Sequence, residues 1–167
     1  MAEIPNQSVM ADDPLFLDTF THSLDAQCRV SLPSGWRSPG GMDFVLFAIE
    51  DKSLALMPQK LFRTFLADAQ KQVITNPAVR RVFSAVAGRA KPCRYDKQGR
   101  MALSREMLDS VGVKDQLTMI GSFSFIRLTA PENADVLNAM DTGSEFEKLL
   151  NPEGMKLCPN GFIRAFS

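Results

Sequence analysis

Apolar residues along the chain form several groups with the spacing of β-strands. Residues 15–24 alternate partly between apolar and polar side chains, which is typical of a half-buried strand, and a turn then leads to a short strand at residues 29–32. Apolar runs farther along predict strand structure centred on 44–58, 93–103 and 116–129. Strand-forming segments therefore occur in both halves of the chain.

Two predicted helices separate the strand groups of the two halves. Apolar residues recur at helical spacing from Leu61 to Val73. Asn76 and Pro77 then form an N-cap with proline at the first helical position, and the apolar face that follows predicts a second helix that ends near Gly88.

Shorter helices are predicted in the second half. Ser104 is a good N-cap for a short helix that ends at Gly112. Spacing within residues 136–140 predicts another amphipathic helix, and Ser144 has the spacing of a capping box that opens a short helix through residue 150.

One segment of the sequence occurs twice. The pattern at residues 24–32 returns 71 residues later at 95–103, with Asp, Gln, Arg and Leu at the same offsets. Such a repeat indicates a duplicated supersecondary unit. Each unit has roughly 40 residues, which is near the size below which a lone core seldom suffices. We therefore expect the two units to fold against each other as one body.

The repeat divides the chain into five segments. They are a mobile N-terminal tail (1–14), a first repeat (15–60), inter-repeat helices (61–90), a second repeat (91–134) and an acidic C-terminal extension (135–167).

Composition limits the class of protein. The 167 residues, 45% hydrophobic and 23% charged, are ordinary for a soluble globular chain, and no apolar run approaches the ~18 residues that span a bilayer. No Lys or Arg precedes Arg29, so the basic start of a secretory signal is missing. Cys28, Cys93 and Cys158 are far apart, which favours free thiols in a reducing cytosol over disulfides or a zinc site.

Charge is segregated along the chain although the net charge is zero. Between Val79 and Arg105 eight basic residues accompany a single acid, Asp96. From Glu132 to Glu153 six acids accompany one Lys148. A local excess of positive charge can attract nucleic acid even when the whole chain is neutral.

The repeated segment has the chemistry of a base-reading turn. An arginine on a tight turn can bind guanine O6 and N7 with two hydrogen bonds, a contact worth ~1–3 kcal/mol of discrimination. An aspartate four residues earlier can accept backbone N–H groups in an Asx-turn and hold the guanidinium. Gly99 allows a positive φ without strain, whereas Cys28 at the equivalent position would cost ~1–2 kcal/mol.

Structural roles compete with this interpretation. A single Asp-x-x-x-Arg turn is more often a surface ion pair, and only its duplication favours DNA. Arg80 and Arg81 lie on an inter-repeat helix and suit structural or subunit contacts, whereas Arg94, Lys97 and Arg105 flank the second turn and could contact phosphate.

Catalysis has little support in the sequence. His22 and Cys28 would share a strand face and suggest a Cys/His nucleophile, but a turn should intervene and no oxyanion-hole motif is present. The sequence also lacks the common nucleotide and metal motifs. We therefore expect no catalytic residues, no metal, no cofactor and no small-molecule substrate.

The doubled motif resembles the MraZ family, which is built from two SpoVT-AbrB-like repeats. The resemblance covers about residues 16–140 and rests on Asp25 with Arg29, on Asp96 with Gly99 and Arg100, and on residues 76–82. It implies an α+β fold, a swapped-hairpin β-barrel with a helical pair between the repeats and a C-terminal helix.

The resemblance also implies a function. Members of this bacterial family are transcriptional regulators that bind double-stranded DNA at short G-rich direct repeats, upstream of the operon for cell division and the cell wall that includes their own gene. They assemble into ring-shaped homo-oligomers. For this chain it implies a cytoplasmic, nucleoid-associated regulator, expected to be a repressor, with no membrane partner. The DNA-binding residues that we expect are Asp25, Gln27, Arg29, Arg94, Asp96, Lys97, Gln98, Gly99 and Arg100.

Two departures from the family pattern make the loops unequal. Gln27 and Gln98 occupy a position where the family commonly has Lys in the first copy, and Cys28 replaces Gly. We therefore expect the second loop to be the stronger DNA contact. The alternative function is an oligomeric protein-interaction scaffold that uses the acidic extension and binds no specific DNA.

Overall fold

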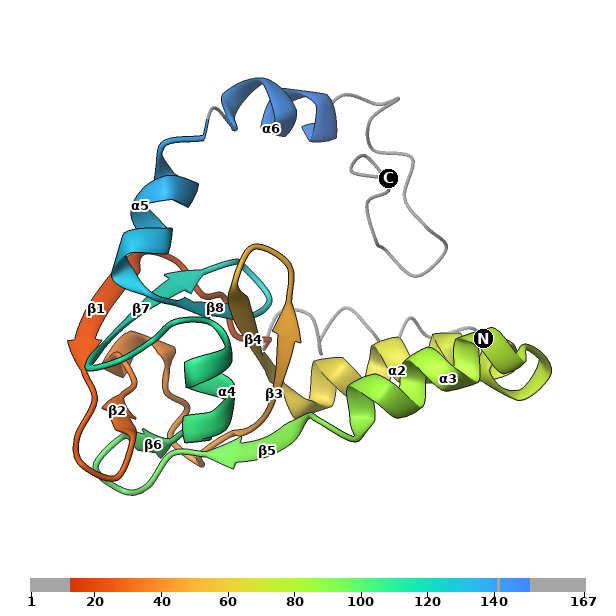
Figure 1. The fold of residues 1–167 in the computed structure, drawn as a ribbon, viewed down its shortest axis with the longest axis horizontal. Coiled ribbons are helices and arrows are strands. Elements are labelled where there is room, and N and C mark those ends of the chain that lie inside the picture. The colour runs from red at the N-terminus through yellow and green to blue at the C-terminus, as the bar shows by residue number, and fades with distance from the viewer. Residues whose placement is uncertain (1–12, 141, 151–167) are drawn as a thin grey trace, which may run out of the picture.

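The computed structural model describes residues 13–140 and 142–150. Most of the predicted N-terminal tail and the end of the acidic extension lie outside these residues. Figure 1 shows a body of strands with a pair of helices on one side and two further helices at the C-terminal end of the coloured chain.

The described residues form two sheets. Six strands form one antiparallel sheet in the order β1-β7-β8-β4-β3-β5, and β2 pairs with β6 in a separate two-stranded sheet. The strands are β1 (Thr19–Ser23), β2 (Arg29–Ser31), β3 (Asp43–Ile49), β4 (Ser53–Pro58), β5 (Lys91–Arg94), β6 (Arg100–Ala102), β7 (Gln116–Gly121) and β8 (Ile126–Thr129).

Strands from the first repeat pair with strands from the second throughout. β1 is antiparallel to β7, β2 to β6, β3 to β5 and β4 to β8. The two units therefore share their hydrogen-bonded ladders and do not form separate domains.

The strands do not close into the barrel that the sequence predicted. β1 and β5 remain the two edges of the six-stranded sheet, and β2 and β6 pair only with each other among the described strands. Each of these two strands has only three residues. Met101 of β6 makes one isolated bridge with Tyr95, just after β5, and this bridge does not extend into a ladder. The coarser prediction of an α+β fold is correct.

The first strand is shorter than predicted. Asp18 has a positive φ of 77°, and its carboxylate accepts the N–H of Thr19 at 2.7 Å. This local bond interrupts the ladder, so that Phe16 makes only an isolated bridge with Phe123 and β1 begins at Thr19.

One hydrophobic core contains side chains from both repeats. Phe16, Phe44 and Leu54 of the first are fully buried, as are Met101 and Met119 of the second. Because neither unit covers these residues alone, the burial of apolar surface stabilises the paired arrangement.

The inter-repeat helices α2 (Gln59–Thr75) and α3 (Pro77–Ala87) pack side by side and project from the body (Figure 1). The side chain of Asn76 accepts the N–H of Ala78 at 3.0 Å, which confirms the predicted N-cap. No residue of either helix is buried, and Ile74 and Val82 are 73% and 60% exposed.

Three other α-helices follow the second Asp-containing turn. In α4 (Arg105–Ser110) the hydroxyl of Ser104 accepts the N–H of Met107 at 3.4 Å, as the N-cap prediction required. Helix α5 (Pro131–Asn138) starts earlier than predicted, because proline suits the first helical position. Helix α6 (Gly143–Leu150) begins at Gly143, so that Ser144 lies within its first turn and is not the N-cap.

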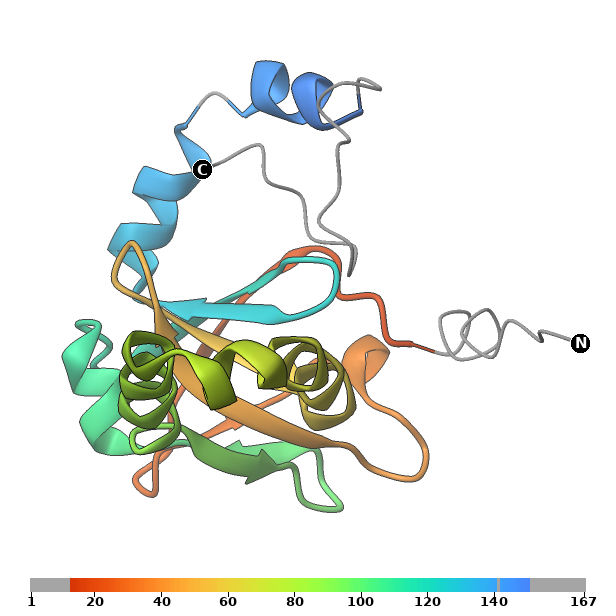
Figure 2. The same cartoon turned by 90° about the vertical axis from the view of Figure 1, so that its right-hand side faces the viewer.

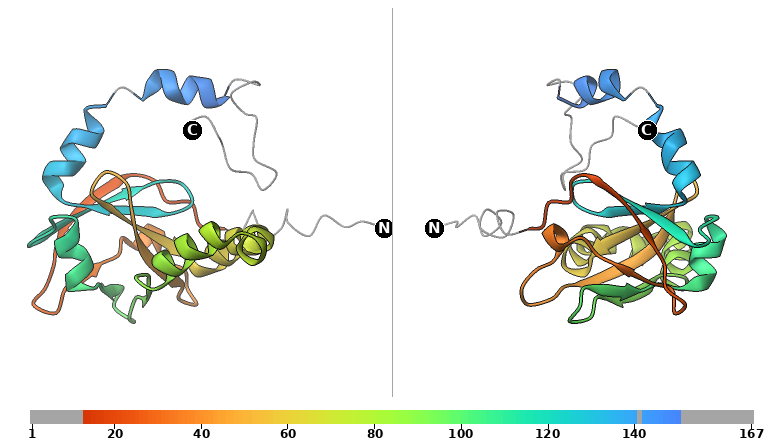
Figure 3. Two further views of the ribbon diagram at one scale, coloured as in Figure 1. Left: turned by 45° about the vertical axis from the view of Figure 1, so that its right-hand side comes forward. Right: turned by 90° about the vertical axis from the view of Figure 1, so that its left-hand side faces the viewer.

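Figure 3 shows α5 and α6 leading away from the sheets. No helix among the described residues is both long and apolar enough to cross a membrane.

Candidate nucleic-acid interface

The first loop connects β1 to β2 and is organised by one carboxylate. Oδ1 of Asp25 accepts the N–H groups of Gln27 at 2.9 Å and of Arg29 at 2.8 Å. Its Oδ2 accepts Nε–H of Arg29 at 2.8 Å, in a charge-assisted hydrogen bond. The predicted Asx-turn and the predicted hold on the guanidinium are both present.

The second loop connects β5 to β6 with the same backbone frame. Oδ1 of Asp96 accepts the N–H groups of Gln98 at 2.9 Å and of Arg100 at 3.0 Å. Nε of Arg100 lies 3.4 Å from Oδ2 of Asp96, and its Nη2 donates to the side-chain oxygen of Gln98. The duplicated sequence thus builds one turn twice.

Both loop aspartates are held in the ionised form. The pKa of Asp25 is lowered, first because its carboxylate accepts the backbone N–H of Arg29. The pKa of Asp96 is lowered in the same way by the backbone N–H of Arg100. Each negative charge therefore stays available at neutral pH to fix its arginine.

The residue before each arginine has a left-handed backbone. Gly99 has a φ of 79° and Cys28 has a φ of 58°, as the sequence predicted. Glycine adopts this conformation freely, whereas a residue with a side chain loses ~1–2 kcal/mol. The first loop is therefore the more strained of the two.

The ribbon of β2 and β6 connects the two loops. Arg29 lies opposite Ala102, and Arg100 lies opposite Ser31. The carbonyl of Gly99 accepts the N–H of Leu32 at 2.8 Å, beyond the end of the paired residues. Figures 1 and 2 show both loops at the lower end of the molecule.

The arginine side chains keep free donors. Side chains of Arg29 and Arg100 are 29% and 36% exposed. Within residues 13–140 and 142–150, both Nη atoms of Arg29 and Nη1 of Arg100 have no hydrogen-bond partner. Nε of Arg29 is hydrogen-bonded to its aspartate, whereas Nε of Arg100 is buried without a hydrogen-bond partner in the described residues and lies 3.4 Å from its aspartate.

The other predicted site residues differ in their contacts. Gln27 and Lys97 are exposed on the loops, and their side chains make no hydrogen bond or salt bridge with another described residue. Arg94 instead pairs with Asp43, with Nη1 2.7 Å from Oδ1, so its charge is partly compensated.

Two arginines that the site prediction did not include reach across to the opposite loop. Arg37 of the first repeat lies against Gly99, where an added Cβ would come within 2.5 Å of its Cζ. Arg105 of the second repeat donates from Nη1 to Sγ of Cys28 at 3.8 Å. No local pattern places these residues, because each contact depends on how the repeats pair.

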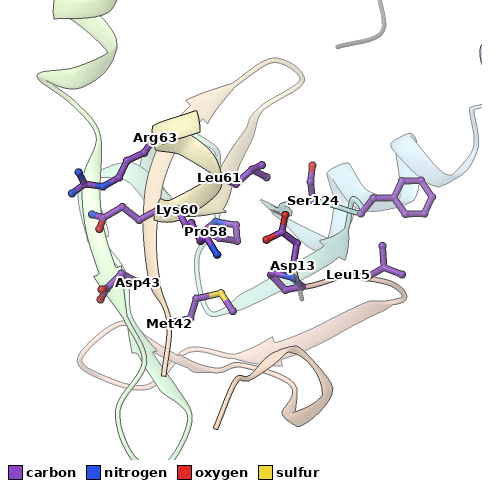
Figure 4. A pocket seen from close by; sticks show the side chains of 12 residues that line it. Asp13, Leu15, Met42, Asp43, Pro58, Lys60, Leu61, Arg63 and Ser124 are labelled. Atoms are coloured by element: carbon purple, nitrogen blue, oxygen red, sulfur yellow. The ribbon is translucent and has the colours of Figure 1, made fainter. Parts of the chain in front are cut away.

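Outside the two loops, the described residues include an aromatic stack and an apolar pocket. The ring of His22 stacks on Phe20 with centroids 6.3 Å apart. No group of three His, Cys, Asp or Glu side chains in the described part of the chain could hold a metal ion. A pocket of about 760 Å³ lies beside the start of α2, with an apolar lining that includes Leu15, Met42 and Leu61 (Figure 4).

The two similar units share one core and pair their strands with each other, and each carries one arginine loop. These features define a class of double-repeat α+β proteins. Residues 15–83 match the family model described as "MraZ protein, putative antitoxin-like". The chain belongs to the MraZ family, whose relatives named below are transcriptional regulators and not enzymes.

Known relatives cover most of the chain. It is 30% identical over 119 residues to the transcriptional regulator MraZ of Corynebacterium jeikeium (strain K411). The matched residues are 71% of this chain and 83% of that protein. Identity is 27% to the MraZ of Thermomicrobium roseum, over 71% of this chain and 84% of that one. It is 31% to the MraZ of Corynebacterium diphtheriae, over 68% and 80%. The resemblance seen in the doubled motif is confirmed.

Proposed function

We propose that this protein regulates transcription by binding DNA at short G-rich direct repeats through its two arginine loops. Arg29 and Arg100 read guanine, and Asp25 and Asp96 hold them in place. The DNA repeats lie upstream of the division and cell-wall gene cluster that includes the protein's own gene, and binding to them represses transcription. The protein works in the cytoplasm on the nucleoid.

The observation that carries this proposal is the repetition of one loop geometry at one end of the molecule. Each loop fixes its arginine through a carboxylate and leaves terminal N–H donors unpaired among the described residues. Guanine offers two acceptors at the spacing of a guanidinium, so each loop can supply one bidentate contact. Carboxylates that already accept backbone N–H groups keep each arginine preorganised.

The reciprocal strand pairing supports the finer fold assignment. Because β1, β2, β3 and β4 each pair with a strand of the other half, we infer a swapped-hairpin arrangement of two SpoVT-AbrB-like repeats at residues 15–60 and 91–134. The inter-repeat helices and the acidic extension are then additions to this body.

The exposed apolar faces of α2 and α3 support a ring-shaped homo-oligomer. Ile74, Val82 and Val86 are exposed on helices that have no buried residue of their own. One chain has only two reading loops, and weak individual contacts gain strongly when several act on linked sites. A ring would bring several loop pairs to several repeats at once.

A second candidate function is a protein-interaction scaffold that binds no specific DNA. It is favoured by the exposed apolar residues Val136 of α5, Met140 between the helices and Phe146 of α6, which lie within an acidic segment. A scaffold of this kind would use α5 and α6 and would not need the paired arginine loops.

The test is binding of the purified full chain to the DNA upstream of its own gene. We expect preference for the G-rich repeats over a scrambled duplex, and a steep loss of affinity as salt rises. Arg100→Ala should lower the preference about 5- to 150-fold, which corresponds to ~1–3 kcal/mol, with Arg89→Ala, at an exposed arginine between α3 and β5, as a charge-matched control. Failure of the wild-type chain to bind any duplex at low salt would favour the scaffold.

If Arg100→Ala binds the same site with unchanged affinity, the second loop does not read the DNA. Light scattering on both variants checks that folding and assembly are intact, and a strict monomer at micromolar concentration would refute the proposed ring.

A further inference from the structure

Arg37 is an exposed arginine without a charged partner in the part of the chain that the structure describes. It follows η1 (Ser34–Trp36) in the first repeat, yet its guanidinium lies against Gly99 in the second loop. No described residue forms a salt bridge or a side-chain hydrogen bond with it. A full positive charge is therefore held beside the reading loop without being neutralised.

The segment that carries Arg37 is fixed against β5. The hydroxyl of Tyr95 accepts the N–H of Ser38 at 2.8 Å and donates to the carbonyl of the same residue at 2.9 Å. Two residues farther on, the carbonyl of Gly40 accepts Nη2–H of Arg94 at 3.3 Å. These bonds hold the backbone next to Arg37, so the Arg37 side chain starts from a fixed point beside the second loop.

Lys97 adds a second free cation to the same place. Arg37 and Lys97 line one open pocket of about 820 Å³, together with Arg94 and Asp96. The carboxylate of Asp96 is the one acid among the lining residues, and it already accepts two N–H groups of its own loop. The charge of Arg94 is compensated by Asp43, so Arg37 and Lys97 remain as the unpaired pair.

The first loop has no such pair. Its crossing arginine, Arg105, has Nη2 2.9 Å from Oδ1 of Asp109 and donates from Nη1 to the carbonyl of Lys114 at 3.1 Å. The position that corresponds to Lys97 is Ala26, and Gln27 beside it is neutral. The two loops thus share their backbone geometry but differ in the cations that surround them.

We propose that Arg37 and Lys97 bind one backbone phosphate of the DNA that the second loop reads, and we call this pair of residues the phosphate seat. This inference rests on the proposed function. A phosphodiester is the ligand class that fits, because it is anionic and offers oxygens to a guanidinium fork and to an ammonium group. Phosphate contacts position a protein on DNA without reading sequence. The seat therefore sets the approach of Arg100 and is absent at the first loop.

The experiment compares Arg37→Ala, Lys97→Ala and the double variant with wild type on the G-rich duplex and on a scrambled duplex. Because both side chains hold one phosphate, the double variant should reduce the slope of log affinity against log salt by about 0.9 per engaged loop, and each single variant by part of that amount. Between 50 and 200 mM salt, loss of this one phosphate contact makes the fall in affinity about 3.5-fold smaller. Arg37→Lys should restore most of the slope.

Binding to both duplexes should weaken together, because a phosphate contact carries no sequence information. Arg89→Ala, between α3 and β5, is the control for the loss of one exposed arginine, and thermal unfolding checks that each variant is folded. Inorganic phosphate is added at the duplex concentration that saturates the protein. It should not displace the duplex, and this result distinguishes a contact with DNA phosphate from a site for the free anion.

The outcomes separate this inference from the function on which it rests. If wild type shows no preference for the G-rich duplex, the proposed function fails. If wild type shows it and Arg37→Ala keeps the same slope, only the phosphate seat is wrong. A variant that loses preference for the G-rich duplex at an unchanged slope would make Arg37 a positioning residue of the reading loop and would also overturn the seat.

Discussion

The contact between Gly99 and Arg37 can be tested by one methyl group. Gly99→Ala would place a Cβ in a backbone with a φ of 79° and within 2.5 Å of Cζ and 2.8 Å of Nε of Arg37. The backbone cannot yield without breaking the Asx-turn at Asp96. The guanidinium is the far end of a flexible side chain, so we expect Arg37 to move away from the loop.

The expected loss of stability is small and can be estimated. A side chain in the left-handed region costs ~1–2 kcal/mol. Reduced freedom of the unfolded chain returns ~0.4–1 kcal/mol of this. The net loss is about 1 kcal/mol, which lowers the melting temperature of a chain of this size by roughly 2–4 °C.

Gly112→Ala is the matched control. Gly112 also has a φ of 79°, but nothing lies within 4 Å of an added Cβ. Both variants should therefore lose similar stability in chemical unfolding. Only Gly99→Ala should also weaken DNA binding and flatten its salt dependence, because only that variant displaces Arg37.

Two results would refute this reasoning. Equal DNA affinity and equal salt dependence for the two variants would show that Arg37 does not act beside the second loop. An unchanged melting temperature for Gly112→Ala would show that the strain estimate for a positive φ is too large.

Three further predictions concern the loops and the thiols. The pKa values of Asp25 and Asp96 are lowered in the folded state, so their stabilisation is complete above the unfolded value near 3.8 and is lost as the pH falls below it. The variant with both Asp25→Asn and Asp96→Asn should therefore lose less stability than wild type below about pH 4 in an acid titration. An equal loss in the two proteins would contradict this. Burial raises the pKa of Cys93 to about 11, so thiol labelling followed by mass spectrometry should modify half-exposed Cys28 before Cys93. Gln27→Lys combined with Cys28→Gly should tighten DNA binding and steepen its salt slope by about 0.9 per engaged loop, whereas no change would show that this loop does not meet DNA.

Local features were predictable because their causes lie within a few residues. Asp25 and Arg29 are four positions apart, so the Asx-turn is encoded in one short segment. The N-caps at Asn76 and Ser104 likewise need only the side chain and the two or three following N–H groups. The late start of β1, at Thr19, was not predicted because Asp18 adopts a positive φ that a glycine would have indicated more clearly.

The cations around each loop were not predictable in this way. Arg37 meets Gly99 only because β2 pairs with β6 and the carbonyl of Gly99 binds Leu32. A pattern search along the chain compares neighbours, whereas this contact joins residues of different repeats. The sequence therefore identified the loops but not the arginine that lies over the second one.

This crossing changes how the inequality of the loops is explained. From the sequence alone, the first loop is weaker because of Gln27 and Cys28. In the structure each loop also depends on an arginine of the other repeat, and Arg105 is occupied by Asp109 whereas Arg37 is free among the described residues. Restoring the first loop to the family pattern should therefore improve it without making it equal to the second. A change at Arg37 or Arg105 in one repeat therefore alters the surroundings of the loop in the other.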